Sequence, residues 1–459
     1  MQKTVVINVV GLTSALIGKH TPFLQKWREG KEKATVEPVL PAVTCSAQTT
    51  YLTGKWPTEH GVVANGWYFR EECEVKLWRQ SNKLVQGEKV WDMAKKKDPN
   101  FTCSNMFWWY NMYSSVDFSV TPRPMYPADG RKLPDVYAQP EALRQRLQKE
   151  LGQFPLFNFW GPNTSIKSSR WIADASIKVD EWHDPTLTLI YLPHLDYNLQ
   201  RHGLNFDIIS KDLNEIDKVC ADLVSYYENK GAEVIFLSEY GITDVNQPIH
   251  INRLLRENGL IAVRDEMGLE VFDAGASKAF ALADHQLAHI YINDLSVKDK
   301  VKSLLENMEG IELVLDEEGK KQHHIAHERA GELVAVADKD SWFTYYYWLD
   351  DDKAPDFART VDIHRKPGYD PVEMFIDPKI KMPMPLIGYK LVKKKLGFRQ
   401  LLDIIPLDAS LVKGSHGRLT EDIAHHPIFY SSKKGALGKE NYEAVEVADL
   451  ILGHVFGEA

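Results

Sequence analysis

The sequence has few cysteines and no long apolar run. Its 459 residues include four cysteines, which lie far apart and without paired metal-ligand spacing. This pattern predicts free thiols in a reducing compartment, with the cytoplasm as the default location. No apolar run approaches the ~20 residues that a membrane-spanning helix needs. The first ten residues, MQKTVVINVV, lack a small-residue cleavage site, so they predict a strand rather than a signal peptide.

Positive charge is not in excess either. The net charge is -9 and the isoelectric point is near 6.0, which argues against a nucleic-acid polymer as partner. The composition, 44% hydrophobic and 26% charged, is that of a globular protein without repeats or low-complexity tracts. The length suits either one large α/β domain over residues 1–459 that carries insertions or two domains, and the single domain is the interpretation we adopt. No feature of the sequence addresses the oligomeric state.

Apolar runs predict a mostly parallel sheet. Thr4–Val10 is a nearly continuous β-branched run, as expected for a strand buried on both faces. Leu187–Leu192 and Ala232–Leu237 are similar, and a helical pattern over Leu213–Lys230 separates them. Strand, helix and strand at this spacing indicate right-handed crossovers and a parallel sheet flanked by helices.

Polar side chains gather where these strands end. Asn8, Asp196 and Glu239 each lie at or just beyond the carboxyl end of a predicted strand. Ligands of open α/β sheets bind at that edge, so we expect a functional site there.

Two regions differ from the rest of the pattern. Residues 100–170 contain the aromatic stretch Asn105–Tyr113 and a proline-rich stretch, and they predict an insertion beside the core. The aromatic side chains suit either a platform for a planar ligand group or a small satellite core. Residues 340–405 combine an aromatic run with charged and proline-rich chain, and they predict a second insertion or subdomain.

Thr44 is the residue around which the remaining motifs are arranged. A proline-bounded extended piece, Glu37–Val43, leads into a short helical pattern that Gly54 is suited to end. Thr44 is placed to be the N-cap of this helix. A hydroxyl at a helix N-terminus is also well placed to attack an anionic phosphoryl or sulfuryl centre. From the local pattern alone, cap and nucleophile both remain open.

The spacing after Thr44 resembles that of the alkaline phosphatase superfamily. The type I phosphodiesterase/nucleotide pyrophosphatase group is the most similar branch, and phosphonoacetate hydrolase is a relative. In that branch a nucleophilic Thr is followed by Thr-Gly, Pro, His-Gly and a substrate-binding Asn. This sequence has Thr44, Thr53-Gly54, Pro57, His60-Gly61 and Asn65 at that spacing. The resemblance implies a three-layer α/β fold with inserted cap segments, Thr44 as nucleophile and Asn65 as substrate ligand.

The same resemblance implies two divalent metal ions, usually zinc. Asp196 matches a ligand that follows a strand, and His416 in Gly-Ser-His-Gly matches a late His ligand. Other ligands differ: Val10 replaces an Asp, Glu239-Tyr240 replaces an Asp-His pair, and Gln200 replaces a His.

The remaining candidate ligands are Asp196, Glu239, His416, Thr44, Asn8 and His364. This set is richer in oxygen than a usual zinc site, so Mn²⁺, Mg²⁺ or a single remaining metal also fits. His364 is either a replacement ligand or a histidine bonded to Asp362 or Asp370.

Three functions follow from this pattern. The first is a metal-dependent hydrolase of small phosphate esters, above all diesters. The second is a phosphonate hydrolase, phosphomonoesterase or sulfatase of the same superfamily; a sulfatase is disfavoured because its Cys/Ser-x-Pro-x-Arg motif is absent at Thr44. The third is a binding protein that kept the fold and lost its metals, which the changes at Val10, Gln200 and Tyr240 favour.

Overall fold

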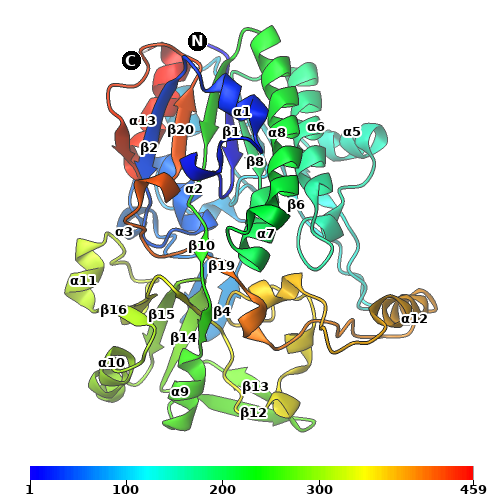
Figure 1. Cartoon of the computed structure of the whole chain (residues 1–459), viewed down its shortest axis with the longest axis vertical. Coiled ribbons are helices and arrows are strands. Elements are labelled where there is room, and N and C mark those ends of the chain that lie inside the picture. The colour runs from blue at the N-terminus through cyan, green and yellow to red at the C-terminus, as the bar shows by residue number, and fades with distance from the viewer. Residues whose placement is uncertain (458–459) are drawn as a thin grey trace.

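The computed structural model describes residues 1–457 and consists of two lobes (Figure 1). The sheet lobe contains a nine-stranded sheet with the order β21-β2-β20-β9-β1-β8-β5-β6-β7. Its strands are β1 (Thr4–Val9), β2 (Glu32–Glu37), β5 (Cys103–Met106), β6 (Phe118–Pro122), β7 (Val136–Gln139), β8 (Leu187–Leu192), β9 (Glu233–Leu237), β20 (Ile428–Ser431) and β21 (Asn441–Glu443).

The centre of this sheet is parallel. β1 pairs in parallel with both β8 and β9, and β5 pairs in parallel with both β8 and β6. β20 and β7 are antiparallel to their neighbours. Every residue of β1 and β8 is buried, as their continuous apolar runs predict.

Helices cover both faces of the sheet, which confirms the predicted three-layer α/β fold. Figure 1 shows α6 and α8 on one side and α2 and α13 on the other. The α-helices of this lobe are α1 (Pro22–Trp27), α2 (Thr44–Thr53), α3 (Pro57–His60), α4 (Val90–Lys97), α5 (Ala142–Leu151), α6 (Ile166–His183), α7 (His194–His202), α8 (Phe206–Asn229) and α13 (Val447–Phe456).

The second lobe has its own antiparallel sheet, with the order β14-β15-β17-β16, and its own hydrophobic core. Its strands and those of the two-stranded sheets are β14 (Ala279–Asp284), β15 (Leu287–Ile292), β16 (Ile311–Leu315), β17 (Leu333–Ala337), β3 (Gly66–Phe69), β4 (Glu74–Leu77), β10 (Thr243–Asp244), β19 (Gly414–Ser415), β11 (Gln247–Ile249), β18 (Ser341–Phe343), β12 (Ala262–Glu266) and β13 (Leu269–Asp273). Its helices are α9 (Ile251–Glu257), α10 (Lys298–Glu306), α11 (Glu317–Gln322) and α12 (Pro383–Lys395).

Short 3₁₀ helices connect these elements. They are η1 (Ser14–Leu16), η2 (Asn82–Leu84), η3 (Leu156–Asn158), η4 (Leu295–Val297), η5 (Asp351–Lys353), η6 (Asp356–Arg359), η7 (Pro371–Met374), η8 (Ala409–Leu411), η9 (Ile423–His425) and η10 (Ala444–Glu446). No helix among residues 1–457 is long and apolar enough to cross a membrane.

Residues 100–170 do not form the separate insertion that we expected. They contribute β5, β6 and β7 to the central sheet, and β5 is completely buried. β5 was not predicted from the sequence because it has only four residues, two of which are polar. The aromatic stretch is mainly core: Trp108 and Tyr110 are buried, and Trp109 packs against Trp78 with ring centroids 4.8 Å apart.

Residues 340–405 lie within the second lobe, which is larger than the predicted insertion. β18 pairs in parallel with β11, so the lobe already includes residues near 247. The aromatic run from Trp342 to Trp348 is buried in the second hydrophobic core. α12 projects from this part of the molecule, at the right of Figure 1.

Candidate active site

Thr44 is the first residue of α2 rather than its N-cap. Val43 holds the N-cap position with extended backbone, φ -131° and ψ 156°, and no side chain caps the helix. The prediction of Thr44 as the cap is therefore wrong by one residue, because the extended chain continues to Val43. Gly54 ends the helix with a left-handed φ of 64°, as predicted. The Thr44 hydroxyl is thus free of a capping role, and its oxygen lies 2.9 Å from the hydroxyl oxygen of Tyr240.

Asn65 lies beside Thr44, as the spacing of the motif implied. Its side-chain oxygen accepts a hydrogen bond of 3.0 Å from the backbone N–H of Cys45, in the first turn of α2. Its side-chain and backbone N–H groups donate to the two oxygens of Asp284, at 3.0 and 2.8 Å. Since the Cys45 N–H requires an acceptor, the orientation of the Asn65 amide is fixed.

Glu239 and Asn8 contact each other because Asn8 lies on β1 and Glu239 follows β9, the strand next to it. One Glu239 carboxylate oxygen accepts hydrogen bonds of 2.6 Å from Asn8 and from Gln48. The other oxygen, Oε2, and the side-chain oxygen of Asn8 have no hydrogen-bond partner in residues 1–457. Burial raises the pKa of Glu239 to about 8, although hydrogen bonds from Gln48 and Asn8 oppose the shift.

Asp196 is held in the first turn of α7. One of its oxygens accepts a hydrogen bond of 2.8 Å from Gln200, one helical turn later. The other accepts a bond of 3.4 Å from the hydroxyl of Tyr240 and lies 3.8 Å from Nε2 of His416. Burial raises the pKa of Asp196 to about 6.

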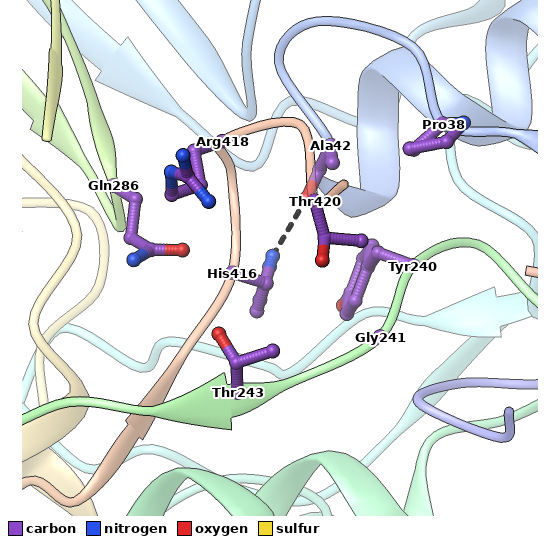
Figure 2. Close-up of a pocket in the computed structure, with 9 residues that line it drawn as sticks. All are labelled: Pro38, Ala42, Tyr240, Gly241, Thr243, Gln286, His416, Arg418 and Thr420. Atoms are coloured by element: carbon purple, nitrogen blue, oxygen red, sulfur yellow. Dashed lines mark hydrogen bonds between the residues drawn. The ribbon is translucent and has the colours of Figure 1, made fainter. Parts of the chain in front are cut away.

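His416 stacks on Tyr240 and faces the site with an unprotonated nitrogen. The two rings are nearly parallel, at 7° with centroids 3.7 Å apart. Nδ1 of His416 donates to the carbonyl of Ala42 at 2.7 Å, as the dashed line in Figure 2 shows. A carbonyl only accepts, so Nδ1 carries the proton and Nε2 keeps its lone pair. Nε2 has no hydrogen-bond partner within the described chain, and burial together with His285 holds the pKa of His416 well below its usual range.

Asp284 and His285 complete the site from the second lobe, and sequence reasoning missed both. They lie at the turn between β14 and β15, with Nδ1 of His285 2.7 Å from Asp284. The His285 ring lies 3.8 Å from that of His416 and 3.6 Å from that of Tyr369, by centroids. The adjacent Asp and His residues were a signal, but nothing in the local sequence indicates that this turn packs against Asn65 and His416.

Gln48, Tyr240 and Tyr369 were also missed as contacts of the site. Gln48 lies four residues after Thr44 on α2, so helical spacing could have identified it. Tyr240 was interpreted only as the loss of a ligand. Tyr369 donates a hydrogen bond of 2.9 Å to the side-chain oxygen of Gln200.

His364 is the one predicted ligand that the structure does not bring to the others. It is exposed, and the charged groups that act on it are Lys132, Arg79 and Asp362. The nearby Lys366 forms internal ion pairs: its ammonium is buried between Asp370 and Glu373, at 2.7 and 2.8 Å.

The donor atoms at this site fit a cation. Burial of a polar atom without a partner is costly, and Glu239 Oε2, Asn8 Oδ1 and His416 Nε2 are three such atoms. In addition, none of the carboxylates of Asp196, Glu239 and Asp284 forms an ion pair with Lys or Arg in residues 1–457. Carboxylate and amide oxygens and an imidazole are the kinds of donor that divalent ions take, but the Glu239, Asp196 and His416 atoms do not all lie within reach of one ion in the described chain.

Another acidic cluster lies outside the site. Among the described residues, the one group of His, Cys, Asp or Glu atoms close enough to share an ion is His194, Asp212 and Glu215. Nε2 of His194 lies 3.3 Å from each carboxylate, between α7 and α8. The positive charge of Arg201 also acts on Asp212, so this cluster is an ion-pair network that contains none of the predicted ligands.

The site is narrow. A cavity of about 10 Å³, room for about one water molecule, lies beside His416 and Tyr240. Arg418 and Gln286 line it on one side of His416, and Thr420 lines it beside Tyr240 (Figure 2). Arg418 is bound to Glu312 at 2.8 Å.

Known proteins share this chain's sequence pattern and fold. The type I phosphodiesterase / nucleotide pyrophosphatase family matches residues 4–370. Ectonucleotide pyrophosphatase/phosphodiesterase 1 of Saccharomyces cerevisiae is 22% identical over 286 residues. That match covers 54% of this chain and 35% of the yeast protein, so the chain spans about a third of this relative.

Two groups of solved structures have the same fold. Murine ectonucleotide pyrophosphatase/phosphodiesterase 5, solved in complex with AMP, has a TM-score of 0.60 and 14% identity. The match covers 100% of this chain and 95% of the murine one. Phosphonoacetate hydrolase from Sinorhizobium meliloti, in complex with phosphonoformate, has a TM-score of 0.60 and 13% identity, with 100% and 96% covered.

Proposed function

Because the chain belongs to the type I phosphodiesterase / nucleotide pyrophosphatase family, we propose that it hydrolyses phosphate esters of small molecules, diesters above all, with Thr44 as nucleophile. One observation carries the proposal. The Thr44 hydroxyl lies at the N-terminus of a buried helix, among three carboxylates that no Lys or Arg neutralises. Such a site repels an anionic substrate unless a cation is bound, and members of this family are divalent-metal hydrolases.

The residues that would hold divalent ions are Glu239 and Asn8 on one side and Asp196 and His416 on the other, with Thr44 beside them, because the atoms of Glu239, Asp196 and His416 do not all lie within reach of one ion in the described chain. A bound ion would lower the pKa of the attacking hydroxyl and neutralise phosphoryl charge. Zinc is the family's usual metal, whereas the oxygen-rich donor set also suits Mn²⁺ or Mg²⁺. Neither His364 nor the His194 cluster belongs to this set.

Tyr240 gives the Thr44 proton a path. Its hydroxyl lies 2.9 Å from the Thr44 oxygen and donates to Asp196 at 3.4 Å. The Thr44 hydroxyl therefore donates to Tyr240, and the chain of hydrogen bonds ends on a carboxylate whose pKa is about 6. Asp196 is placed to act as general base while no ion is bound to it, whereas an ion held by Asp196 would instead stabilise the Thr44 oxygen directly.

In the first step, the Thr44 oxygen forms a bond to phosphorus, the bond to the leaving alcohol breaks, and the Thr44 proton passes through Tyr240 to Asp196. The alcohol leaves with a proton returned from Asp196. Asn65 and the first N–H groups of α2 hold the non-bridging oxygens as charge develops. Water then cleaves the phosphothreonine, which restores Thr44 and releases the phosphate product.

Two alternatives remain as outcomes of the test. The fold is shared with a phosphonoacetate hydrolase, so a phosphonate or monoester substrate belongs in the panel. The Tyr240 ring stacked on His416 favours a non-catalytic binding protein, because it occupies a place where the family is expected to carry an imidazole.

The test is metal analysis of the purified protein, with turnover of a chromogenic aryl phosphodiester in the presence of Zn²⁺, Mn²⁺ or Mg²⁺. We expect Thr44→Ala to lower the rate by about 10³-fold or more. The matched control is Thr53→Ala in the last turn of the same helix, whose hydroxyl bonds only to Thr49. No turnover of diester, monoester or phosphonate with any of the three ions would overturn the enzyme proposal.

We also propose a reducing compartment, with the cytoplasm as its default. All four cysteines are unpaired, and Cys45, Cys103 and Cys220 are buried. The yeast relative is named an ectonucleotide pyrophosphatase, so fractionation of cells that express the tagged full chain is the direct test.

A further inference from the structure

Residues 378–401, which we call the basic arm, carry a concentrated positive charge on an acidic protein. The arm contains α12 and the chain that follows it, and it projects from the body of the molecule (Figure 1). Its 24 residues include six lysines, one arginine and no acidic residue, whereas the whole chain has a net charge of -9. Lys381, Lys394 and Lys395 form no ion pair within the described chain, while Lys390 is paired with Asp403.

The same arm exposes an unusual amount of apolar surface. Of the 20 large hydrophobic side chains that are exposed in the described residues, eight lie in the arm, between 45% and 70% exposed. These are Met382, Met384, Tyr389, Leu391, Val392, Leu396, Phe398 and Leu401. Apolar side chains scattered singly over a surface need no explanation, but a cluster of this size marks an interaction site.

Apolar and basic side chains alternate around the helix. Tyr389, Val392 and Leu396 recur at helical spacing and share one face of α12. Lys393 and Lys395 flank that face, and the Lys393 ammonium lies 4.6 Å from the centre of the Tyr389 ring. Lysine stems can lie along apolar surface while their ammonium groups reach out to anions.

A neighbouring loop extends the surface. Arg399 donates a hydrogen bond of 2.7 Å to the carbonyl of Ala128, which ties the arm to the loop between β6 and β7. That loop exposes Met125 and Tyr126, at 42% and 55%. The docking surface therefore consists of two chain segments rather than one helix.

We propose that the basic arm binds the surface of an anionic lipid bilayer, with the apolar side chains of α12 among the lipid headgroups. Charge complementarity favours an anionic partner, since the arm has no acidic residue. A nucleic acid would meet the lysines but leave eight apolar side chains in water, and a bilayer interface accommodates both. No described helix can span a membrane, so the arm lies on the surface.

The basic arm and the candidate active site are joined by a short stretch of chain. The arm starts nine residues after Tyr369, which contacts Gln200 and His285 in the site. The proposal does not depend on hydrolase activity, because it rests on the exposed arm alone.

The experiment is flotation of the purified full chain with phosphatidylcholine vesicles, with and without phosphatidylserine, over a series of NaCl concentrations. We expect binding that requires phosphatidylserine and weakens with salt. Lys393→Glu/Lys394→Glu/Lys395→Glu should reduce it about tenfold or more, and Val392→Ser/Leu396→Ser should also reduce it. All five side chains are exposed or half-buried, so the thermal midpoint should not move.

The matched control is Lys298→Glu/Lys300→Glu/Lys302→Glu on α10, another lysine-rich helix of the second lobe. This control makes the same change in net charge and should leave vesicle binding unchanged. Equal binding by the arm variant and the wild-type chain would overturn the proposal, as would no binding to phosphatidylserine vesicles. Self-association, or oligonucleotide binding, that only the arm variant loses would instead assign the arm to a second copy of the chain or to a nucleic acid.

Discussion

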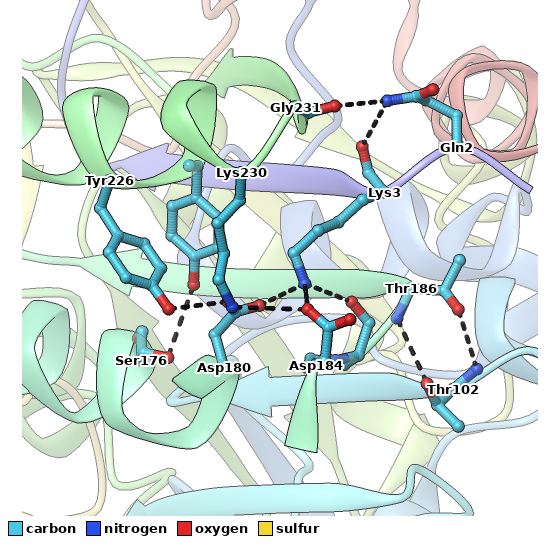
Figure 3. Close-up of polar contacts among 12 residues, drawn as sticks. Gln2, Lys3, Thr102, Ser176, Asp180, Asp184, Thr186, Tyr226, Lys230 and Gly231 are labelled. Carbon is cyan, nitrogen blue, oxygen red and sulfur yellow. Dashed lines mark hydrogen bonds and ion pairs between the residues drawn. The ribbon is translucent and has the colours of Figure 1, made fainter. Parts of the chain in front are cut away.

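Buried carboxylates are paired with lysines at one end of strands β1, β8 and β9, but not at the other end. At their amino ends, Asp180 is buried between two lysines, with Lys3 at 2.5 Å and Lys230 at 2.8 Å. The Tyr226 hydroxyl donates to the same carboxylate at 2.9 Å, and Lys3 and Lys230 also reach Asp184 (Figure 3). The negative charge at this end is balanced within the protein.

At the carboxyl ends of the same strands, the charge is not balanced. Asp196 and Glu239 are buried without a lysine or arginine, and Glu239 Oε2 has no hydrogen-bond partner in the described residues. The consequence is visible in the pKa of Glu239, which burial raises to about 8. A balanced cluster stabilises the fold, whereas an unbalanced one is suited to bind a ligand of opposite charge.

The largest expected effect is a difference in hydrolysis rate between variants at the two ends of these strands. Glu239→Gln keeps the shape of the side chain but removes the charge that would attract a cation, so we expect the hydrolysis rate to fall about 100-fold or more. Asp180→Asn, at the balanced end, should leave the rate per folded molecule unchanged. Steady-state turnover of an aryl phosphodiester with added metal measures both. Similar losses in the two variants would remove the distinction between the ends.

The second effect separates them by stability. Asp180→Asn removes the buried carboxylate that Lys3 and Lys230 share and leaves them only the exposed Asp184, and we expect a loss of about 2–3 kcal/mol in the free energy of unfolding. This is less than for a fully buried pair, because both lysines reach solvent. Asp222→Asn, which breaks an exposed pair with Arg170, is the control and should cost less than about 1 kcal/mol. Urea denaturation compares the two, and equal losses would contradict the prediction.

A third change makes the unbalanced end more like its family. Tyr240→His places an imidazole next to Glu239 and removes the ring stacked on His416. We expect affinity for Zn²⁺ to rise roughly tenfold, measured by titration calorimetry. Tyr240→Phe is the control: it keeps the ring and should not change affinity, but it breaks the hydrogen-bond path from Thr44 to Asp196 and should slow turnover. An unchanged affinity in Tyr240→His would show that this position does not limit metal binding.

The smallest effect is a dependence of stability on pH. The pKa of Glu239 is about 8 in the folded chain against an ordinary value of 4.5, so the native state holds a proton that the unfolded state has released. Stability should therefore fall as pH rises from 6.5 to 8, by up to about 1 kcal/mol per pH unit, and level off above pH 8. Asp196, with a pKa of about 6, acts below this window.

Metal-free wild type and Glu239→Gln, compared by thermal denaturation across that range, test this dependence. Glu239→Gln has no titrating carboxyl at position 239, so its thermal midpoint should depend less on pH than that of the wild type. Added divalent ion should reverse the wild-type loss at pH 8, because it binds the deprotonated carboxylate. Parallel profiles for the two proteins would assign the slope to other groups.

The sequence predicted those parts of the molecule that depend on local pattern. Continuous apolar runs identified β1, β8 and β9, and the spacing from Thr44 to Asn65 identified two groups that are neighbours in the structure. Polar residues at strand ends identified Asn8, Asp196 and Glu239, since the ends of parallel strands share one edge.

Contacts between lobes could not be predicted in this way. Asp284 and His285 reach the site because a turn of the second lobe docks against it, and no periodicity encodes that contact. β5 was missed because its burial comes from its neighbours rather than from its own residues, Ser104 and Asn105 among them. The two interpretations of His364 could not be separated for the converse reason: its local motif suited a ligand or a histidine beside Asp362, and only the fold shows that the residue is exposed, with Asp362 among the charged groups that act on it.

The position of β2 has a consequence for how the molecule is made. β2 lies between β20 and β21, so the strands that pair with residues 32–37 are synthesised some 390 residues later. His416 likewise reaches Ala42 across 374 positions of sequence. A nascent chain emerging from the ribosome must keep the segment before Thr44 unpaired until then, with an open strand edge that chaperones would have to protect. The segment that leads to Thr44 therefore acquires its strand partners only after residues 428–443 have been synthesised, later than the pairing of β1 with β8 and β9.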